Sequence, residues 1–167
     1  MTDLLVTAAD TAWWEGKHFR CAIGRGGFST DKKEGDGATP VGAWKMRRLL
    51  WRADRLPRPP TGLPVAPTAR TDGWCDDPLE TRYNEPVSLP FGGSHERLWR
   101  RDRVYDLIVV LGYNDDPPRP GRGSAIFLHV ARRDFRPTEG CVALRRADLL
   151  EVLAGATRSS RVIVAPR

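Results

Sequence analysis

The sequence predicts a mainly β protein, a sandwich or barrel with one or two short helices. Three observations support this fold class. Apolar residues occur in many short runs, several of them alternating with polar residues, as strands do. The 167 residues include 16 glycines and 14 prolines, so turns are frequent. Only residues 146–153 have the apolar spacing of a convincing helix. We expect residues 1–167 to form one domain, because this length suffices for one hydrophobic core.

Four short strands are expected in the first third of the chain. Gly16 and Lys17 suit a tight hairpin turn, and residues 39–42, Thr-Pro-Val-Gly, suit a turn that enters the last of these strands. Residues 24–37 are rich in glycine and charge and predict a long loop. This loop lacks the Lys-Ser/Thr of a phosphate-binding loop, which argues against nucleotide binding. The expected strands are residues 4–8, 11–15, 18–23 and 43–50.

A proline-rich segment follows, with Pro57, Pro59, Pro60, Pro64 and Pro67 between residues 52 and 70. Proline removes a backbone donor and favours extended chain, so this segment cannot be a central strand. Two interpretations stay open. The segment is either a structural surface loop or a stiff lid over the active cleft, since long loops in compact domains are often lids.

The second half of the chain contains the strongest apolar runs. Residues 105–112 predict a buried strand, and residues 124–130 predict a strand that delivers His129 near its end. Residues 146–153 predict a helix, with Gly155 as its stop. Residues 161–164, Arg-Val-Ile-Val, predict a closing strand.

The net charge of +6 suits acidic partners such as nucleic acid, anionic lipid or carboxylate-rich wall peptides. The basic residues are mixed with acidic ones, which argues against nucleic acid. No apolar run approaches the roughly 18 residues of a transmembrane helix. The densest basic cluster is interpreted first as a solvated loop and second as a substrate or envelope contact. It contains Arg97, Arg100, Arg101 and Arg103.

Three cysteines permit at most one disulfide, between Cys21 and Cys75, which leaves Cys141 free. The alternative is that Cys21 belongs to the core and Cys75 lies beside the cleft. No pair of cysteines or set of cysteines and histidines has the spacing of a zinc site. We therefore expect no metal and no cofactor.

His129 and Cys141 are the candidate catalytic pair. A strand carries His129, a polar loop follows, and Gly140-Cys141 opens the next apolar alternation. An imidazole within hydrogen-bond reach can take the proton of a thiol and make it a nucleophile. Glycine before the cysteine leaves room for a substrate carbonyl, and its backbone freedom can aim N–H groups at an oxyanion. The competing interpretation is that both side chains are only packed in the core.

The segment from His129 to Thr138-Glu139-Gly140-Cys141-Val142 resembles the signature of the L,D-transpeptidase family, the YkuD-type catalytic domain. That signature is a histidine at a strand end, a spacer, and Ser/Thr-x-Gly-Cys-Ile/Val. Residues 35–42, GDGATPVG, resemble an early turn of the same family. Further motifs resemble a proteobacterial branch, and the likeness runs from about Leu4 to Val164. These motifs are residues 73–78, 83–84, 105–106, 112–114 and 123–129.

The sequence departs from the family pattern at three places. Many members have histidine where this chain has Glu139, and arginine where it has Ala143. The familiar His-Gly-Thr is His129-Val130-Ala131 here. These differences affect the expected substrate contacts more than the nucleophile, and they leave the rate of carbapenem acylation open.

The resemblance implies a β-sandwich in which Cys141 is the nucleophile, His129 its base, and N–H groups near Gly140 hold the oxyanion. It also implies a thioester formed from a donor stem peptide of peptidoglycan. The side-chain amine of a diaminopimelate in an acceptor stem then attacks this thioester and cross-links the cell wall. A place in the periplasm or cell envelope follows, although the opening residues, MTDLLV, do not have the pattern of a secretion signal.

Substrate contacts are expected on both sides of the nucleophile. Aromatic rings suit sugars or peptides, paired aspartates suit an ammonium group or turn capping, and the arginines after His129 suit stem carboxylates or mere solvation. The candidates are Trp74, Asp76, Asp77, Tyr83, Asn84, Arg132, Arg133, Arg136, Thr138, Glu139 and Arg145.

Two other functions remain open from the sequence. Water could attack the same thioester, which would make the protein an L,D-carboxypeptidase or amidase. Alternatively, the chain could be a non-catalytic basic module that binds wall or nucleic acid. The sequence does not indicate an oligomeric state.

Overall fold

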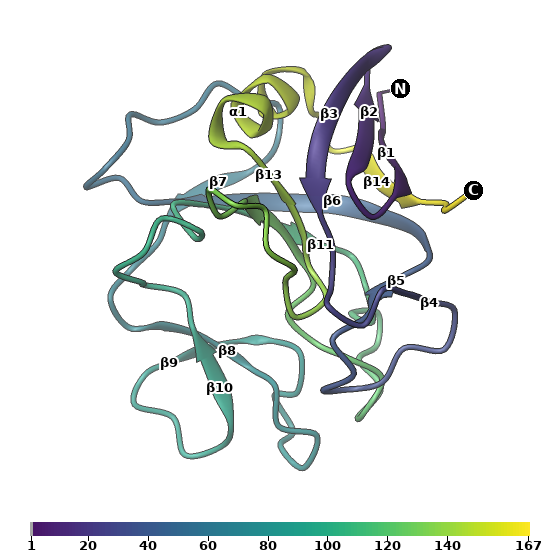
Figure 1. Ribbon diagram of the computed structural model, residues 1–167. Coiled ribbons are helices and arrows are strands. Elements are labelled where there is room, and N and C mark those ends of the chain that lie inside the picture. Colours follow the sequence, from purple (N-terminus) through teal and green to yellow (C-terminus); the bar gives the residue numbers. More distant parts are fainter. Residues whose placement is uncertain (1) are drawn as a thin grey trace.

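The computed structural model describes residues 2–167, which form fourteen strands and one helix, so the mainly β prediction is confirmed (Figure 1). The helix is α1 (Arg146–Gly155). The strands are β1 (Leu4–Ala8), β2 (Thr11–Trp14), β3 (Lys17–Ala22), β4 (Phe28–Ser29), β5 (Thr39–Pro40), β6 (Gly42–Trp51), β7 (Val65–Pro67), β8 (Asp72–Cys75), β9 (Pro86–Ser88), β10 (His95–Arg97), β11 (Leu107–Leu111), β12 (Phe127–Val130), β13 (Val142–Leu144) and β14 (Arg161–Val164).

The long strand β6 closes the main sheet into a barrel. Its first half, from Gly42 to Lys45, pairs with β14, and its second half, from Met46 to Trp51, pairs with β11. The strand order is β11-β12-β13-β3-β2-β1-β14-β6, and the β6–β11 pairing joins the two ends. Alternating side chains fill the interior, for example Leu128 and Val130 from β12. Closure removes exposed sheet edges and encloses one apolar core.

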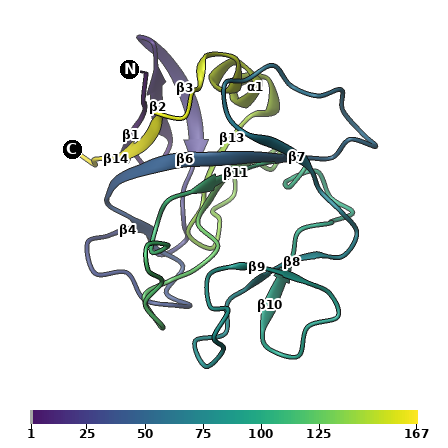
Figure 2. The ribbon, with the colours of Figure 1, turned by 180° about the vertical axis from the view of Figure 1, so that it is seen from behind.

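A second, smaller sheet of β10, β8 and β9 lies beside the barrel on the side away from α1 (Figures 1 and 2). A separate apolar cluster joins the two sheets. Trp74 of β8 packs edge-on against Phe127 of β12, with ring centroids 5.1 Å apart. Phe127 points to the opposite face of β12 from Leu128, because side chains alternate along a strand. The outer face of β12 is therefore also covered by protein.

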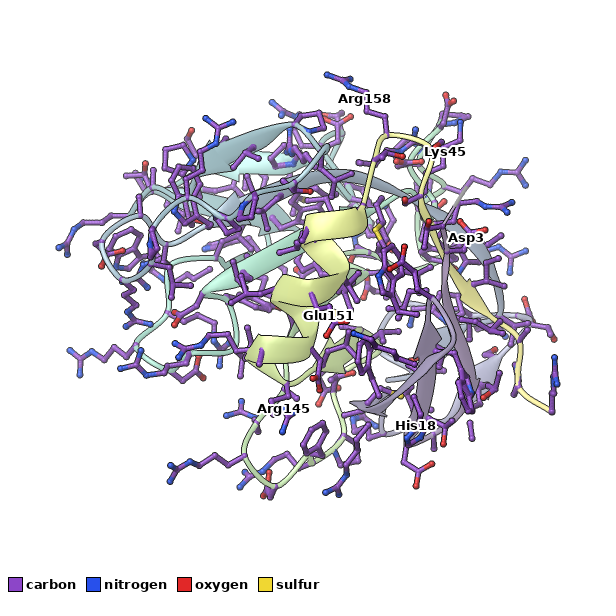
Figure 3. The ribbon with its side chains drawn as sticks, turned by 90° about the horizontal axis from the view of Figure 1, so that it is seen from above. Asp3, His18, Lys45, Arg145, Glu151 and Arg158 are labelled. Carbon is purple, nitrogen blue, oxygen red and sulfur yellow. The ribbon has the colours of Figure 1, made fainter. Side chains whose placement is uncertain are left out.

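Helix α1 packs on the barrel through Leu149, Val152 and Leu153, and Glu151 forms an ion pair with Lys17 of the β2–β3 hairpin (Figure 3). Gly155 was expected to lie just past the helix as its stop, and this prediction is wrong. Gly155 is the last helical residue, and the ring of Trp14 lies 3.1 Å from where its Cβ would stand. Glycine is needed here because the tryptophan ring approaches the helix closely.

Several expected boundaries shift because single residues adopt left-handed backbone. The hairpin turn is formed by Glu15 (φ 48°) and Gly16 (φ 78°), one residue earlier than predicted, as in a type I′ turn. Strand β12 begins at Phe127 and not at residue 124, because Ala125 has φ 53°. The other strands expected from the sequence form within one or two residues of the predicted ends.

The proline-rich segment lies at a sheet edge, as its composition requires. Val65–Pro67 forms β7 and pairs in parallel with the end of β6 only. Gly62 bridges to Thr157 just beyond α1. The lining of the main pocket, within the described part of the chain, includes no residue of 52–70, so this conformation does not place the segment over the cleft.

All three cysteines are free and buried, so the disulfide alternative is wrong for this structure. Cys21 lies in the barrel interior on β3, whereas Cys75 lies on β8 in the smaller sheet. Burial raises the pKa of the Cys21 thiol to about 12.

Arg55 connects the start of the proline-rich segment to the loop before β11. Its guanidinium lies 2.6 Å from a carboxylate oxygen of the fully buried Asp106 and donates to the carbonyls of Arg101 and Asp102. Removing one partner of a buried ion pair leaves an uncompensated charge. We expect Arg55→Met to lower the free energy of unfolding by about 3 kcal/mol in urea denaturation.

Arg103 provides the matched control, since it lies 3.7 Å from the same carboxylate but is 71% exposed. Arg103→Met should cost less than about 1 kcal/mol. Equal losses for the two variants would contradict the assigned role of Arg55.

Candidate active site

The register of two parallel strands brings His129 and Cys141 to the same face of the sheet. Leu128 is opposite Val142 and His129 is opposite Ala143, so one step back places Phe127 opposite Cys141. Because side chains alternate, His129 and Cys141 share the face opposite to the barrel core. Both line a pocket of about 580 Å³.

Gly140 makes the sharp turn that presents Cys141. Its φ is 132°, and an added Cβ would lie 2.8 Å from the carbonyl oxygen of Ala38. The carbonyl of Gly140 accepts a 2.9 Å hydrogen bond from the Thr39 hydroxyl, which in turn accepts the Gly24 N–H at 2.8 Å. These hydrogen bonds form a clamp. It joins the Thr-Pro turn (residues 39–42) and the glycine-rich loop (residues 24–37) to the turn that precedes Cys141.

The thiol of Cys141 is hydrogen-bonded to the backbone before and within β12. The Phe127 N–H donates to Sγ at 3.3 Å, and the S–H donates to the carbonyl of Ala125 at 3.2 Å. The β12–β13 ladder begins only at Leu128 and Val142. The sulfur thus forms hydrogen bonds with two backbone groups just before the ladder begins.

Burial, with a smaller contribution from the nearby Glu96 carboxylate, raises the pKa of the Cys141 thiol to about 12. The Phe127 N–H and the ammonium of Lys32 act in the opposite direction. Lys32 is itself buried and ion-paired with Asp36 at 2.7 Å. The resting nucleophile is consequently a neutral thiol at physiological pH.

His129 is a neutral base. Its Nδ1 donates to the carbonyl of Val130 at 2.9 Å, which assigns the tautomer with an unprotonated Nε2. Burial lowers the pKa of His129 to about 4, and Arg100 and Arg132 add to that effect. The ring of Tyr105 packs edge-on against the imidazole at 5.2 Å and fixes its plane. The site therefore holds a neutral thiol and a neutral base, not a preformed ion pair.

Three carboxylates line the pocket without an ion-pair partner among residues 2–167. Glu34 accepts from the Tyr83 and Ser124 hydroxyls, Asp76 from Ser94, and Glu96 from Tyr105. Burial raises the pKa of Glu96, the hydrogen bond from Tyr105 lowers it, and the charges of Asp76 and Glu34 raise it further.

Three arginines line the same pocket, and two aspartates of nearby loops pair with them, with Asp102 shared by two of the arginines. Arg100 pairs with Asp102 at 2.6 Å, Arg132 with Asp102 at 3.7 Å, and Arg136 with Asp134 at 3.1 Å. The unbalanced charge of the pocket lining is thus negative, although the whole chain carries +6.

A family comparison agrees with this geometry. The model of the L,D-transpeptidase catalytic domain, YkuD, matches residues 5–164. The chain belongs to this family. The resemblance inferred from the sequence is thereby confirmed, and the barrel is consistent with the family fold. No relative is found among curated proteins.

Membership makes the chain an enzyme of the L,D-transpeptidase type, with peptidoglycan as its substrate class and the cell envelope as the implied place of action. None of the helices in residues 2–167 is long and apolar enough to cross a membrane.

The pocket that holds His129 and Cys141 contains about half of the residues proposed from the sequence. Thr138 and the exposed Glu139 lie at its rim, and Glu139 pairs with Arg25 at 2.8 Å. Arg133 is exposed and is not part of the lining. Arg145 pairs with Asp148 near the start of α1 (Figure 3). The proposed residues in the lining are Asp76, His129, Arg132, Arg136, Thr138, Glu139 and Cys141.

The aromatic residues Trp74 and Tyr83 pack behind the pocket and do not line it. Trp74 and Tyr83 are buried, and Tyr83 donates to Glu34 at 2.7 Å. Asp77 caps a turn by accepting the N–H groups of Leu79 and Ser94, which agrees with the capping alternative. Asn84 is a buried hydrogen-bonding residue.

Several lining residues were not singled out as site candidates from the sequence, among them Glu34, Glu96, Arg100 and Tyr105. Glu34 lies in the glycine-rich loop, and Arg100 belongs to the basic cluster interpreted as solvated. Glu96 and Tyr105 meet only because β10 packs near the chain before β11. Periodicity cannot reveal such a contact, since it depends on how two sheets pack.

The clamp behind the nucleophile can be tested at Thr39, which is 1% exposed. Thr39→Val removes the hydroxyl that joins Gly140 to Gly24 and leaves two buried backbone groups unpaired. We expect it to lower the free energy of unfolding by about 2 kcal/mol in urea denaturation. Thr39→Ser, which keeps the hydroxyl, should lose clearly less. A valine variant as stable as the serine variant would argue against the clamp.

The charge state of the thiol predicts its reactivity. With a Cys141 pKa of about 12, the thiolate fraction should rise throughout the range accessible to experiment. The rate of Cys141 alkylation by iodoacetamide, followed by mass spectrometry, should increase about tenfold per pH unit from roughly pH 6 to 10. A plateau near neutral pH would instead indicate a thiolate–imidazolium pair.

Proposed function

We propose that the protein is a peptidoglycan L,D-transpeptidase in which Cys141 forms a thioester with a donor stem peptide. The observation that carries the proposal is the shared pocket of Cys141 and a neutral His129, held on adjacent parallel strands. The family match supports it. No metal or cofactor takes part in the proposed reaction.

In the first half-reaction the sulfur of Cys141 attacks the carbonyl carbon of the donor bond while the thiol proton passes to Nε2 of His129. The carbon–nitrogen bond then breaks, and the leaving amine takes that proton. Because the resting thiol donates to Ala125, it must turn toward His129 when substrate binds. General base catalysis of this kind avoids a stable buried ion pair.

The oxyanion requires backbone donors close to the sulfur. The Gly140 N–H donates to the Thr138 hydroxyl at 3.1 Å, and that hydroxyl donates to the Cys141 carbonyl at 2.6 Å. This engagement of Gly140 leaves the N–H groups of Glu139 and Cys141 as the proposed oxyanion donors. Thr138 then acts by fixing the turn that carries them.

In the second half-reaction a neutral acceptor amine attacks the thioester carbonyl and gives a proton to His129. The carbon–sulfur bond then breaks, and His129 returns that proton to the sulfur of Cys141. The carboxylates of Glu34, Asp76 and Glu96 suit the ammonium of a diaminopimelate before it reacts, because they have no cation of their own. Arg132 and Arg136 of the same lining suit the stem carboxylates. The same thiol is the proposed target of carbapenem acylation, and the proposed place of action is the periplasm.

The test is mass spectrometry of disaccharide tetrapeptide muropeptides after incubation with the protein. Cross-linked dimers formed by the wild type and not by Cys141→Ser would support the transpeptidase. Trimmed monomers without dimers would favour the carboxypeptidase or amidase. Unchanged muropeptides would count against both enzymes and favour a non-catalytic binding module.

We expect Cys141→Ser to abolish dimer formation and His129→Gln to reduce its rate by about 10² to 10⁴. The loss follows from removal of the base, not of the fold, so circular dichroism should be unchanged. His18→Gln is the matched control, because His18 is exposed on β3 outside the pocket. A His129→Gln variant with the wild-type rate would contradict the mechanism.

A further inference from the structure

Asn84 uses its whole hydrogen-bonding capacity behind the nucleophile. Its Oδ1 accepts the Trp74 indole N–H at 2.9 Å and the Ala125 N–H at 3.0 Å. Its Nδ2 donates to the carbonyls of Tyr113 at 3.0 Å and Asn114 at 2.7 Å. Two acceptor and two donor positions are all that a side-chain amide offers. Asn84 is only 5% exposed, so water cannot easily replace any of these bonds.

Ala125 depends on this side chain for its conformation. Its φ is 53°, a left-handed region that alanine rarely adopts because its Cβ crowds the backbone. The conformation is therefore enforced from outside, and the Asn84 Oδ1 holds the Ala125 N–H. Left-handed backbone at Ala125 breaks the strand before β12, and the carbonyl of the same residue accepts the Cys141 S–H at 3.2 Å.

We propose that Asn84 is a positioning residue for the nucleophile, acting through the left-handed backbone of Ala125. The proposal rests on the role of Cys141 put forward above. One amide fixes Ala125, the Ala125 carbonyl fixes the thiol proton, and the Phe127 N–H fixes the sulfur. The thiol is thereby held protonated beside His129 until a substrate carbonyl displaces the S–H from Ala125.

The remaining contacts of Asn84 offer a purely structural alternative. Trp74 belongs to the second apolar cluster, and the carbonyls of Tyr113 and Asn114 belong to the turn after β11. Loss of these contacts would loosen the protein locally without acting through Ala125. An experiment must therefore separate the Ala125 contact from the other three.

The test is the rate of Cys141 alkylation by iodoacetamide at pH 8, which needs no substrate. A hydrogen bond donated by the thiol stabilises its protonated form, so loss of this bond lowers the thiol pKa. Asn84→Ala should raise the alkylation rate by up to about tenfold, the equivalent of one pKa unit.

A double-mutant cycle with Ala125→Gly isolates the route. Glycine adopts left-handed backbone without strain, so Asn84→Ala in the Ala125→Gly background should change the rate by less than about twofold. Asn114→Gly is the matched control, because glycine tolerates the left-handed backbone whose carbonyl Asn84 uses and removes only a side chain that does not contact Ala125. It should leave alkylation unchanged.

An equal effect of Asn84→Ala in both backgrounds would overturn the proposal. So would an unchanged rate in a folded Asn84→Ala variant. With muropeptides, Asn84→Ala should lower kcat and leave KM unchanged. A wild type that makes no dimers would refute the proposed transpeptidase but leave the alkylation cycle readable.

Discussion

The hydrogen bond from the Thr39 hydroxyl to the Gly140 carbonyl is the contact on which the active site depends. It joins two turns that are 101 residues apart in the sequence, and the same hydroxyl also accepts the Gly24 N–H. Gly24 and Gly140 approach so closely that a Cβ on Gly24 would lie 2.9 Å from the Gly140 Cα. Three segments therefore meet with no space for side chains, and the position of Cys141 follows from that contact. A loose clamp would displace the thiol and leave the barrel intact.

Burial decides the chemistry that this position allows. Removal from water disfavours the charged form of each group, so the pKa of the thiol rises to about 12 and that of His129 falls to about 4. Both groups are neutral over the physiological range. A neutral thiol resists oxidation and unwanted alkylation, because the thiolate is the reactive species. In the proposed mechanism, the Cys141 thiol is activated only in the substrate complex. There the carbonyl under attack receives the negative charge as the thiol proton moves to His129.

The sequence predicted the strands that have regular apolar alternation. It also predicted the pair His129 and Cys141, which matches a family motif. The strands ending at His129 and beginning after Cys141 were predicted because apolar alternation depends only on neighbouring residues. Glu34 and Glu96 were not found, since their positions in the pocket depend on contacts between segments far apart in the sequence. Trp74 and Asn84 were expected to touch substrate and instead support the pocket from behind. An aromatic residue and an amide next to a catalytic motif look alike in sequence whether they line a site or hold it.

The charge of the pocket depends on which charged side chains of its lining form ion pairs, and not on the net charge of the whole chain. The whole chain is basic, yet the three arginines around Cys141 are paired with two aspartates, whereas three carboxylates of the lining have only hydroxyl groups as side-chain partners among residues 2–167. A hydroxyl can satisfy a lone pair without cancelling the charge, so these carboxylates keep an unbalanced negative potential at the cleft. That potential also raises the pKa of the Cys141 thiol, through Glu96. In the free protein Glu96 therefore favours the protonated thiol, whereas the ammonium that we propose these carboxylates bind arrives only after the thioester has formed.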